Sequence, residues 1–384
     1  MWRVALRMLL GDRAKYLALV VGLAFAVLLI AQQGSIFLGL LIRSTGPLQN
    51  VNQPDLWVTD PYVRFISETR YLSEVDLQRV RSVPGVAWAE PFFSARGIVE
   101  LPGGNFKSVN VVGIDRTTMI GQPPAVLEGN LEDLRIPDAV FIEEGSVRRL
   151  AYRDEQGREV QPKIGDVLKL NDRRAVVVGV IRAKSGFDSP ALMYTSFENA
   201  TSYVPLGRNR ISFILVGVKP EADLRQVQAS VNTLPELTAL TKFELQMKSI
   251  DFILKETGIG INFGITVTLG VIIGLAISAA IFYQFTLENL RNFAVLKAMG
   301  ARWFTLVGMV LLQALWVGLI GFGIGVGVAG AFSLLGRRPA AELSVFFPWQ
   351  LLVGSLGAMM LCVLVSSVVS LLRVLRLEPG VVFK

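Results

Sequence analysis

Four long apolar stretches constrain this chain more than any other feature of its sequence. They cover residues 16–42, 257–285, 304–335 and 349–372. An α-helix needs about 20 apolar residues to cross a bilayer, and each stretch meets that length. Because lipid offers no hydrogen-bond partners to an exposed backbone, such segments span the membrane as helices. We therefore expect an α-helical membrane protein with four transmembrane helices.

Residues 43–256 lie between the first two spans and lack a comparable apolar stretch. Strand-like patterns, such as 56–59, mix irregularly with helix-like ones, such as 73–83. In the latter, Ser73 and Asp76 have the spacing of a capping box. Strands and helices mixed in this way are typical of α+β folds. We expect an α+β extracytoplasmic domain inserted between transmembrane helices 1 and 2.

The distribution of charge predicts the topology. Residues 43–256 hold 26 Lys and Arg against 27 Asp and Glu, whereas the rest of the chain holds 12 against 4. Ten of these 12 basic residues lie in 1–15, 286–303 and 373–384. Short basic segments stay on the cytoplasmic side. We therefore expect a multi-pass protein of the cell inner (cytoplasmic) membrane, with both termini and 286–303 inside and 336–348 as an outer loop. The net charge of +7 then reflects topology, and no nucleic-acid partner is expected.

Composition excludes several kinds of chemistry. The chain has no histidine, and its single cysteine, Cys362, lies in an apolar stretch. Histidine-based catalysis and intrachain disulfides are therefore excluded. No nucleophile–base set is recognisable, so we expect no catalytic residue, no metal site and no cofactor bound by this chain. The aromatic residues Phe92, Phe93, Tyr203 and Phe213 line a ligand groove or, more commonly, a core.

Small and polar residues inside the spans suggest how the helices pack. Two pairs of glycines have a spacing that lets helix backbones approach closely in lipid, either within the chain or between two copies. They are Gly270, Gly274, Gly321 and Gly325. Gln32 and Gln33 lie deep in the first span. They either line a substrate route or make hydrogen bonds between helices.

The polar segment 286–303 separates the second and third spans and has a helical period of its own. Gly300 ends that period, as glycine commonly does just past a helix. One interpretation is a helix that rests passively on the membrane surface. The other is a short coupling helix that contacts a cytoplasmic partner and moves both adjoining spans together.

The sequence NFAVLKAMGA in this segment resembles the E-x-A-x-L-K-A-x-G-A signature of the MacB/FtsX family of ABC-transporter permeases. The matching positions are Ala294, Leu296, Lys297, Ala298, Gly300 and Ala301. Asn292 departs from the family pattern, which commonly has Glu there. The layout of spans and domain is similar to this family, including its DevC-like members, over the whole chain. The resemblance implies a split βαβ core with a second lobe, expected at about 121–202.

The resemblance implies a permease subunit that is not itself an enzyme. The chain has no G-x-x-x-x-G-K-[ST] phosphate loop, so ATP and Mg are expected in a separate ABC ATPase subunit. A second permease copy, as a homodimer, is expected as a further partner. The residues expected to couple to the ATPase are Glu288, Leu290, Arg291, Ala294, Val295, Lys297, Met299 and Gly300.

The function implied by the resemblance is mechanotransmission. ATP hydrolysis in the partner would change the conformation of the outer domain and drive export of a lipid, peptide or drug-like substrate. A periplasmic adaptor and an outer-membrane duct would then complete the route. Three alternatives stay open at this point: a non-transporting complex that regulates a periplasmic enzyme, lipoprotein extraction, and a membrane-anchored sensor or receptor.

Overall fold

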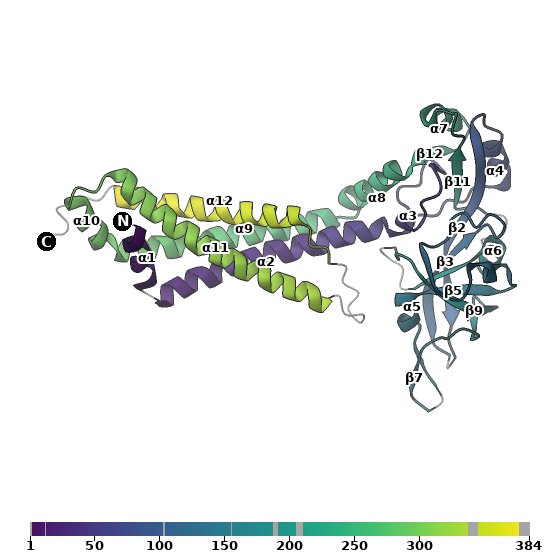
Figure 1. Cartoon of the computed structure of the whole chain (residues 1–384), viewed down its shortest axis with the longest axis horizontal. Coiled ribbons are helices and arrows are strands. Elements are labelled where there is room, and N and C mark those ends of the chain that lie inside the picture. Colours follow the sequence, from purple (N-terminus) through teal and green to yellow (C-terminus); the bar gives the residue numbers. More distant parts are fainter. Residues whose placement is uncertain are drawn as a thin grey trace. The chain divides into compact units, whose positions relative to one another are not determined.

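The computed structural model describes residues 2–11, 13–102, 104–154, 156–186, 191–204, 210–336 and 345–375. Their contacts define two compact units: Met1–Leu40 with Gly258–Lys384, and Leu41–Thr257. We call the first the membrane unit and the second the α+β domain (Figure 1). Most of the expected outer loop, at 337–344, and of the expected tail, at 376–384, lies outside the described residues.

The membrane unit is helical. Its helices are α1 (Trp2–Gly11), α2 (Arg13–Ser44), α9 (Ile259–Glu288), α10 (Leu290–Ala298), α11 (Trp303–Gly336) and α12 (Trp349–Leu375). In the described part of the chain, four of them, α2, α9, α11 and α12, are long and apolar enough to cross a membrane. This confirms the expected four transmembrane helices.

The core of the membrane unit lies among α2, α9, α11 and α12. Leu23 of α2, Phe282 of α9, Val317 of α11 and Met359 of α12 belong to one buried cluster. α9 and α12 run side by side (Figure 1). A polar contact joins this pair, because the Ser366 hydroxyl donates to the Leu275 carbonyl oxygen over 3.4 Å.

The α+β domain is built on one mixed sheet. Its strands are β1 (Leu56–Thr59), β2 (Val86–Glu100), β3 (Phe106–Ile114), β4 (Ala125–Glu128), β5 (Ala139–Glu143), β8 (Val167–Leu170), β9 (Arg173–Arg182), β10 (Leu192–Ser196), β11 (Phe213–Val218) and β12 (Thr238–Thr241). In the residues described, their order is β12-β1-β11-β2-β3-β10-β5-β9-β4, with β8 pairing β2 and β9. A separate short hairpin consists of β6 (Tyr152–Arg153) and β7 (Glu159–Val160).

Helices connect and cover these strands. They are α3 (Gly46–Asn50), α4 (Glu74–Arg81), η1 (Leu131–Arg135), α5 (Glu144–Arg149), α6 (Phe197–Tyr203), α7 (Leu224–Asn232) and α8 (Lys242–Glu256). The sequence predicted the start of α4 correctly. The Ser73 hydroxyl accepts from the Asp76 backbone N–H while the Asp76 carboxylate accepts from the Ser73 N–H, which completes the capping box.

The strands β12, β1, β11 and β2 form a split βαβ core. All three pairings in this group are antiparallel, α4 connects β1 to β2, and α7 connects β11 to β12. Val80 of α4 and Val231 of α7 are buried against one face of these strands. Trp57 of β1 packs with Leu245 of α8 in a different cluster. The structure thus confirms the α+β domain and its split βαβ core.

From the sequence we expected the second lobe to begin near residue 121, but it begins earlier in the chain. β3 pairs with β2 from Phe92↔Ile114 to Glu100↔Phe106, so the lobe begins at β3 and shares β2 with the core. The reason is the length of β2. Its first half pairs with β11 of the core, and its second half, from Phe92 to Glu100, pairs with β3.

The four aromatic residues that were expected to line either a ligand groove or a core are packed in the core. Phe92, Phe93, Tyr203 and Phe213 are each 3% exposed or less. Phe92 and Phe213 pack edge-on against Trp57, with ring centroids 5.6 and 5.7 Å away. Such packing contributes to stability. Tyr203 also borders a cavity of the domain.

Candidate functional site

The candidate site is α10, the short helix that joins α9 to α11. Its C-terminal end is a Schellman motif. The Gly300 N–H donates to the Lys297 carbonyl over 3.1 Å, and the Ala301 N–H donates to the Leu296 carbonyl over 3.0 Å. Gly300 has φ of +88°, and nothing lies within 4 Å of where its Cβ would be. Glycine is therefore favoured here by backbone conformation and not by crowding.

One face of α10 is packed inside the membrane unit. Phe293 and Ala294 are each 1% exposed and cluster with Leu306 and Val310 of α11. Leu290 packs against the same cluster. This face therefore holds α10 against α11.

The opposite face of α10 carries exposed apolar side chains. Val295 is 41% exposed and Met299 is 78% exposed. Arg291, four residues before Val295, is also exposed. Exposed apolar side chains rimmed by polar residues mark interaction surfaces. We call Arg291, Val295 and Met299 the α10 surface.

The end of α9, just before α10, is linked to the first membrane helix through an ion pair. The Glu288 carboxylate at the end of α9 pairs with the Lys15 ammonium group near the start of α2. It also accepts from Gln284 Nε2 over 3.4 Å. Glu288 therefore connects α9 to α2 in this conformation.

The residues expected to contact the ATPase differ in their exposure. Arg291, Val295 and Met299 are exposed, and Lys297 is partly exposed. Ala294 is buried and clusters with Leu306 and Val310 of α11. Its small size suits the close packing of α10 on α11.

The paired glycines pack against α2 of the same chain. A Cβ on Gly274 would lie 2.7 Å from Ala26 Cβ, and one on Gly321 would lie 2.9 Å from Leu23 Cβ. A Cβ on Gly325 would lie 2.6 Å from the Ala24 carbonyl oxygen, and one on Gly270 would lie 3.3 Å from Ile30 Cγ1. The close approach that the spacing predicted is therefore made within one chain, and α2 covers the faces expected to meet a second copy.

The sequence drew attention to Gln32 and Gln33 as polar residues inside a membrane span, but a different glutamine, Gln313, is buried in the membrane unit. Gln32 and Gln33 are only half-buried. Gln313 of α11 is 1% exposed, and its Nε2 donates to the Ala5 carbonyl oxygen over 2.7 Å. This bond holds α1 on α11. The position of Gln313 inside an apolar stretch could have drawn attention to it. Its partner could not be identified from the sequence, because Ala5 is more than 300 residues away.

The α+β domain contains a cavity of about 900 Å³ lined by residues that include Arg81, Glu90 and Asp115. Glu90 lies 3.0 Å from Arg81, and burial raises the pKa of Glu90 despite this partner. The Asp115 carboxylate accepts from the backbone N–H groups of Thr117 and Thr118. These carboxylates are thus engaged within the domain. In the described ranges, no group of three or more His, Cys, Asp or Glu could hold a metal ion.

Comparison with known proteins places this arrangement in a family. The model of the MacB-like periplasmic core domain matches residues 17–234, more than half of the chain, and that of the FtsX-like permease C-terminal region matches residues 258–379. An ABC transporter permease of Mycobacterium tuberculosis (strain CDC 1551 / Oshkosh) is 25% identical over 81% of this chain and 78% of its own length. A Mycobacterium bovis ABC transporter permease is 24% identical over 83% and 80%.

Solved structures give weaker likenesses. The extracellular domain of the noncanonic ABC-type transporter YknZ from Gram-positive bacteria aligns with a TM-score of 0.36 and 14% identity, over 50% of this chain and 100% of that domain. The periplasmic region of MacB from Actinobacillus actinomycetemcomitans gives 0.37 and 15%, over 50% and 90%. The assignment therefore rests on the two family models. The chain belongs to the ABC transporter permeases of the MacB/FtsX type, which are multi-pass membrane proteins.

Proposed function

We propose that this permease is driven by a separate ABC ATPase subunit that binds the α10 surface on the cytoplasmic side of the inner membrane. ATP and Mg²⁺ bind in that subunit. The permease transmits the conformational change to its α+β domain and drives export of a lipid, peptide or drug-like substrate. Two permease copies pair in the assembly. A periplasmic adaptor and an outer-membrane duct extend the export route.

The observation that carries this proposal is the contrast between the two faces of α10. Val295 and Met299 are exposed, whereas Phe293 on the other face is buried against α11. A partner on the exposed face would therefore push on a helix that is already fixed to α11. The Glu288–Lys15 pair extends that contact to α2, so the push would reach three spans.

The test uses substitutions that leave the buried face intact. We would introduce Val295→Asp and Met299→Glu and co-purify the permease in lipid nanodiscs with its candidate ABC ATPase subunit. The matched controls are Val75→Asp and Met247→Glu, which make the same chemical changes at exposed positions of the α+β domain. An Ala294 variant is unsuitable, because a charge placed there would disrupt packing on α11.

We expect both α10 variants to reduce the recovery of the ATPase at least tenfold and to abolish the effect of the permease on ATP hydrolysis. We expect the control variants to retain both properties. Equal recovery with all four variants would show that the ATPase binds elsewhere. Recovery of no ATPase even with the wild-type permease would remove the basis for the proposal.

A further inference from the structure

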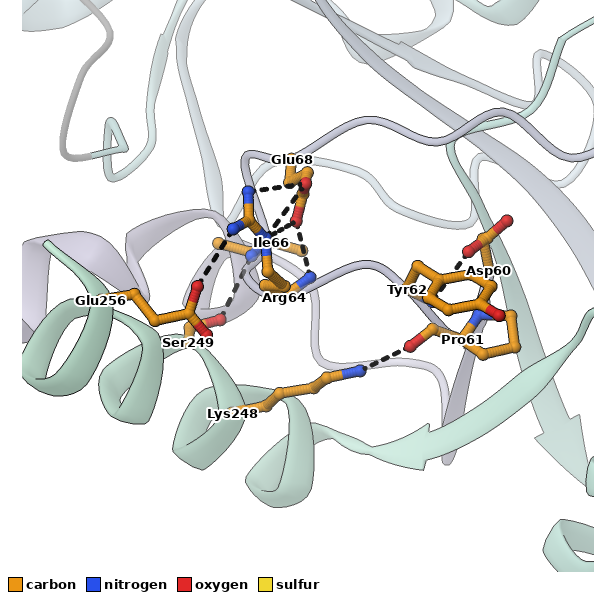
Figure 2. A network of polar contacts seen from close by, with 9 residues as sticks. All are labelled: Asp60, Pro61, Tyr62, Arg64, Ile66, Glu68, Lys248, Ser249 and Glu256. Atoms are coloured by element: carbon orange, nitrogen blue, oxygen red, sulfur yellow. Dashed lines mark hydrogen bonds and ion pairs between the residues drawn. The ribbon is translucent and has the colours of Figure 1, made fainter.

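A segment after β1 lies along the C-terminal half of α8 (Figure 2). We call this segment, residues 60–68, the strap. β1 follows the first membrane helix through α3, and α8 is the last helix before α9. The strap therefore joins the part of the domain that follows α2 to α8, the helix that leads into α9.

The central contacts of the strap are buried or apolar. The Ile66 backbone N–H donates to the Ser249 hydroxyl over 3.2 Å, and Ser249 is 0% exposed. The Ser249 hydroxyl in turn donates to the Leu245 carbonyl over 2.8 Å. One helical turn later, the rings of Phe65 and Phe252 stack with centroids 4.5 Å apart and planes 9° from parallel.

Arg64 closes the strap over the last turns of α8. Its Nε and Nη2 donate to the two Glu68 carboxylate oxygens, each over 3.1 Å, while its Nη1 donates to Glu256 Oε2 over 3.0 Å. The guanidinium carbon also lies 4.7 Å from the centroid of the Phe252 ring. Figure 2 shows Arg64 between the Glu68 carboxylate of the strap and Glu256, the final residue of α8. The same side chain also contacts the aromatic stack.

The positions on α8 have a regular spacing. Ser249, Phe252 and Glu256 follow one another at intervals of three and four residues, so they lie on one face of the helix. Lys248 adds a bond from its Nζ to the Pro61 carbonyl oxygen over 3.2 Å. The N-terminal turn of α8 is held differently, because Glu244 pairs with Arg225 of α7 over 3.0 Å.

We propose that the strap fastens the C-terminal half of α8 to the sheet, so that a displacement of α9 moves the whole α+β domain and does not peel α8 away. Arg64 is the positioning residue of this joint. The role in transmission rests on the proposed function, whereas the fastening of α8 can be measured by itself. The strap defines where force enters the domain, next to β1, which pairs with both β11 and β12.

The first experiment measures the fastening directly. Spin labels at Lys255→Cys on α8 and Ala229→Cys on α7, in a Cys362→Ala background, report the position of α8 in the full chain in nanodiscs. We would compare Arg64→Ala/Phe65→Ala with a control pair, Arg79→Ala/Phe106→Ala. Arg79 makes an exposed ion pair in α4, and Phe106 is 67% exposed in β3.

We expect a narrow distance distribution for the parent and control proteins, and at least a twofold broader one for the strap variant. The same width in all three would overturn the proposal. A second pair of labels, at Ala229→Cys and Leu334→Cys, tests transmission with ATP and the partner ATPase. The complex of the strap variant with the ATPase should still hydrolyse ATP but lose the nucleotide-dependent distance change seen in the parent.

The two experiments distinguish the two ideas. If the parent shows no nucleotide-dependent change, the proposed function and the transmitting role of the strap both fail, whatever the first labels show. If the parent and the strap variant respond equally to nucleotide, the strap is not the joint, although the proposed function stands.

Discussion

A glycine-to-alanine series in α9 and α11 tests the packing of the membrane helices on α2. The structure predicts a graded effect, because the added methyl group meets different atoms at each position. At Gly325 it would lie 2.6 Å from the Ala24 carbonyl oxygen, a backbone atom that cannot rotate away. At Gly270 it would lie 3.3 Å from a side-chain carbon of Ile30. At Gly327 nothing lies within 4 Å.

Two opposing effects set the magnitude of each change. Overpacking costs about 1–3 kcal/mol, and replacing glycine by alanine inside a helix contributes up to about 1 kcal/mol of stability. Gly325→Ala should therefore destabilise the membrane unit by about 1–2 kcal/mol, or roughly a 5- to 30-fold shift of the folding equilibrium. Gly270→Ala should be nearly neutral. Gly327→Ala should be neutral or stabilising by up to about 1 kcal/mol.

The assay is unfolding in mixed micelles with increasing SDS, followed by far-UV circular dichroism. The order of the midpoints decides the outcome, because all three variants exchange the same residue types. We expect Gly325→Ala to unfold first and Gly327→Ala last. Equal midpoints, or a reversed order, would refute the close contact between α11 and α2 on which the reasoning depends.

Three further predictions concern polar contacts. Lys15→Glu should lower stability by no more than about 1 kcal/mol, since the pair with Glu288 is partly exposed, and Lys15→Glu/Glu288→Lys should restore it in a double-mutant cycle. Burial pushes the pKa of Glu68 upward, but hydrogen bonds from Arg64 hold it below its ordinary value of 4.5. The stability that Glu68 contributes is therefore present above pH 4.5 and is lost as the pH falls through its lower folded pKa. Unfolding of the α+β domain measured against pH should show this loss in the parent and not in Glu68→Gln. Gln313→Leu removes the hydrogen bond that holds α1, at a net cost of about 1 kcal/mol, and should speed trypsin cleavage of α1.

Local patterns in the sequence predicted local features well. The apolar stretches identify the spanning helices because lipid imposes helix on them, and Ser73 with Asp76 identifies the start of α4 because both capping partners lie within one turn. Asn171 and Asp172 form the turn between β8 and β9, with φ of 47° and 64°. Both residues tolerate positive φ better than most others.

Features that depend on distant partners could not be read in this way. β2 is the strand that unites the two lobes, yet it contains Pro91 and Gly97, which commonly interrupt strands. The strap was missed because Ile66 and Ser249 are 183 positions apart. The glycine spacing predicted close approach but not the partner helix. Likewise, the helical period of α10 could not show that Ala294 is buried against α11 while Val295 is exposed, because both of these adjacent residues are apolar.

The topology of the sheet gives a physical reason for a strap at this position. The chain enters the α+β domain through α3 into β1 and leaves it from β12 through α8, and β1 and β12 are neighbours. Any difference in movement between α2 and α9 would therefore act on two adjacent strands, and β12 is only four residues long. A short strand at the edge of a sheet resists such a load poorly, because few ladder hydrogen bonds hold it. The strap relieves β12 by attaching α8 directly to the chain that follows β1. Exposed ion pairs contribute little to stability, so the buried bond of Ser249 and the stack of Phe65 on Phe252 should bear most of this load, with Arg64 keeping both in register.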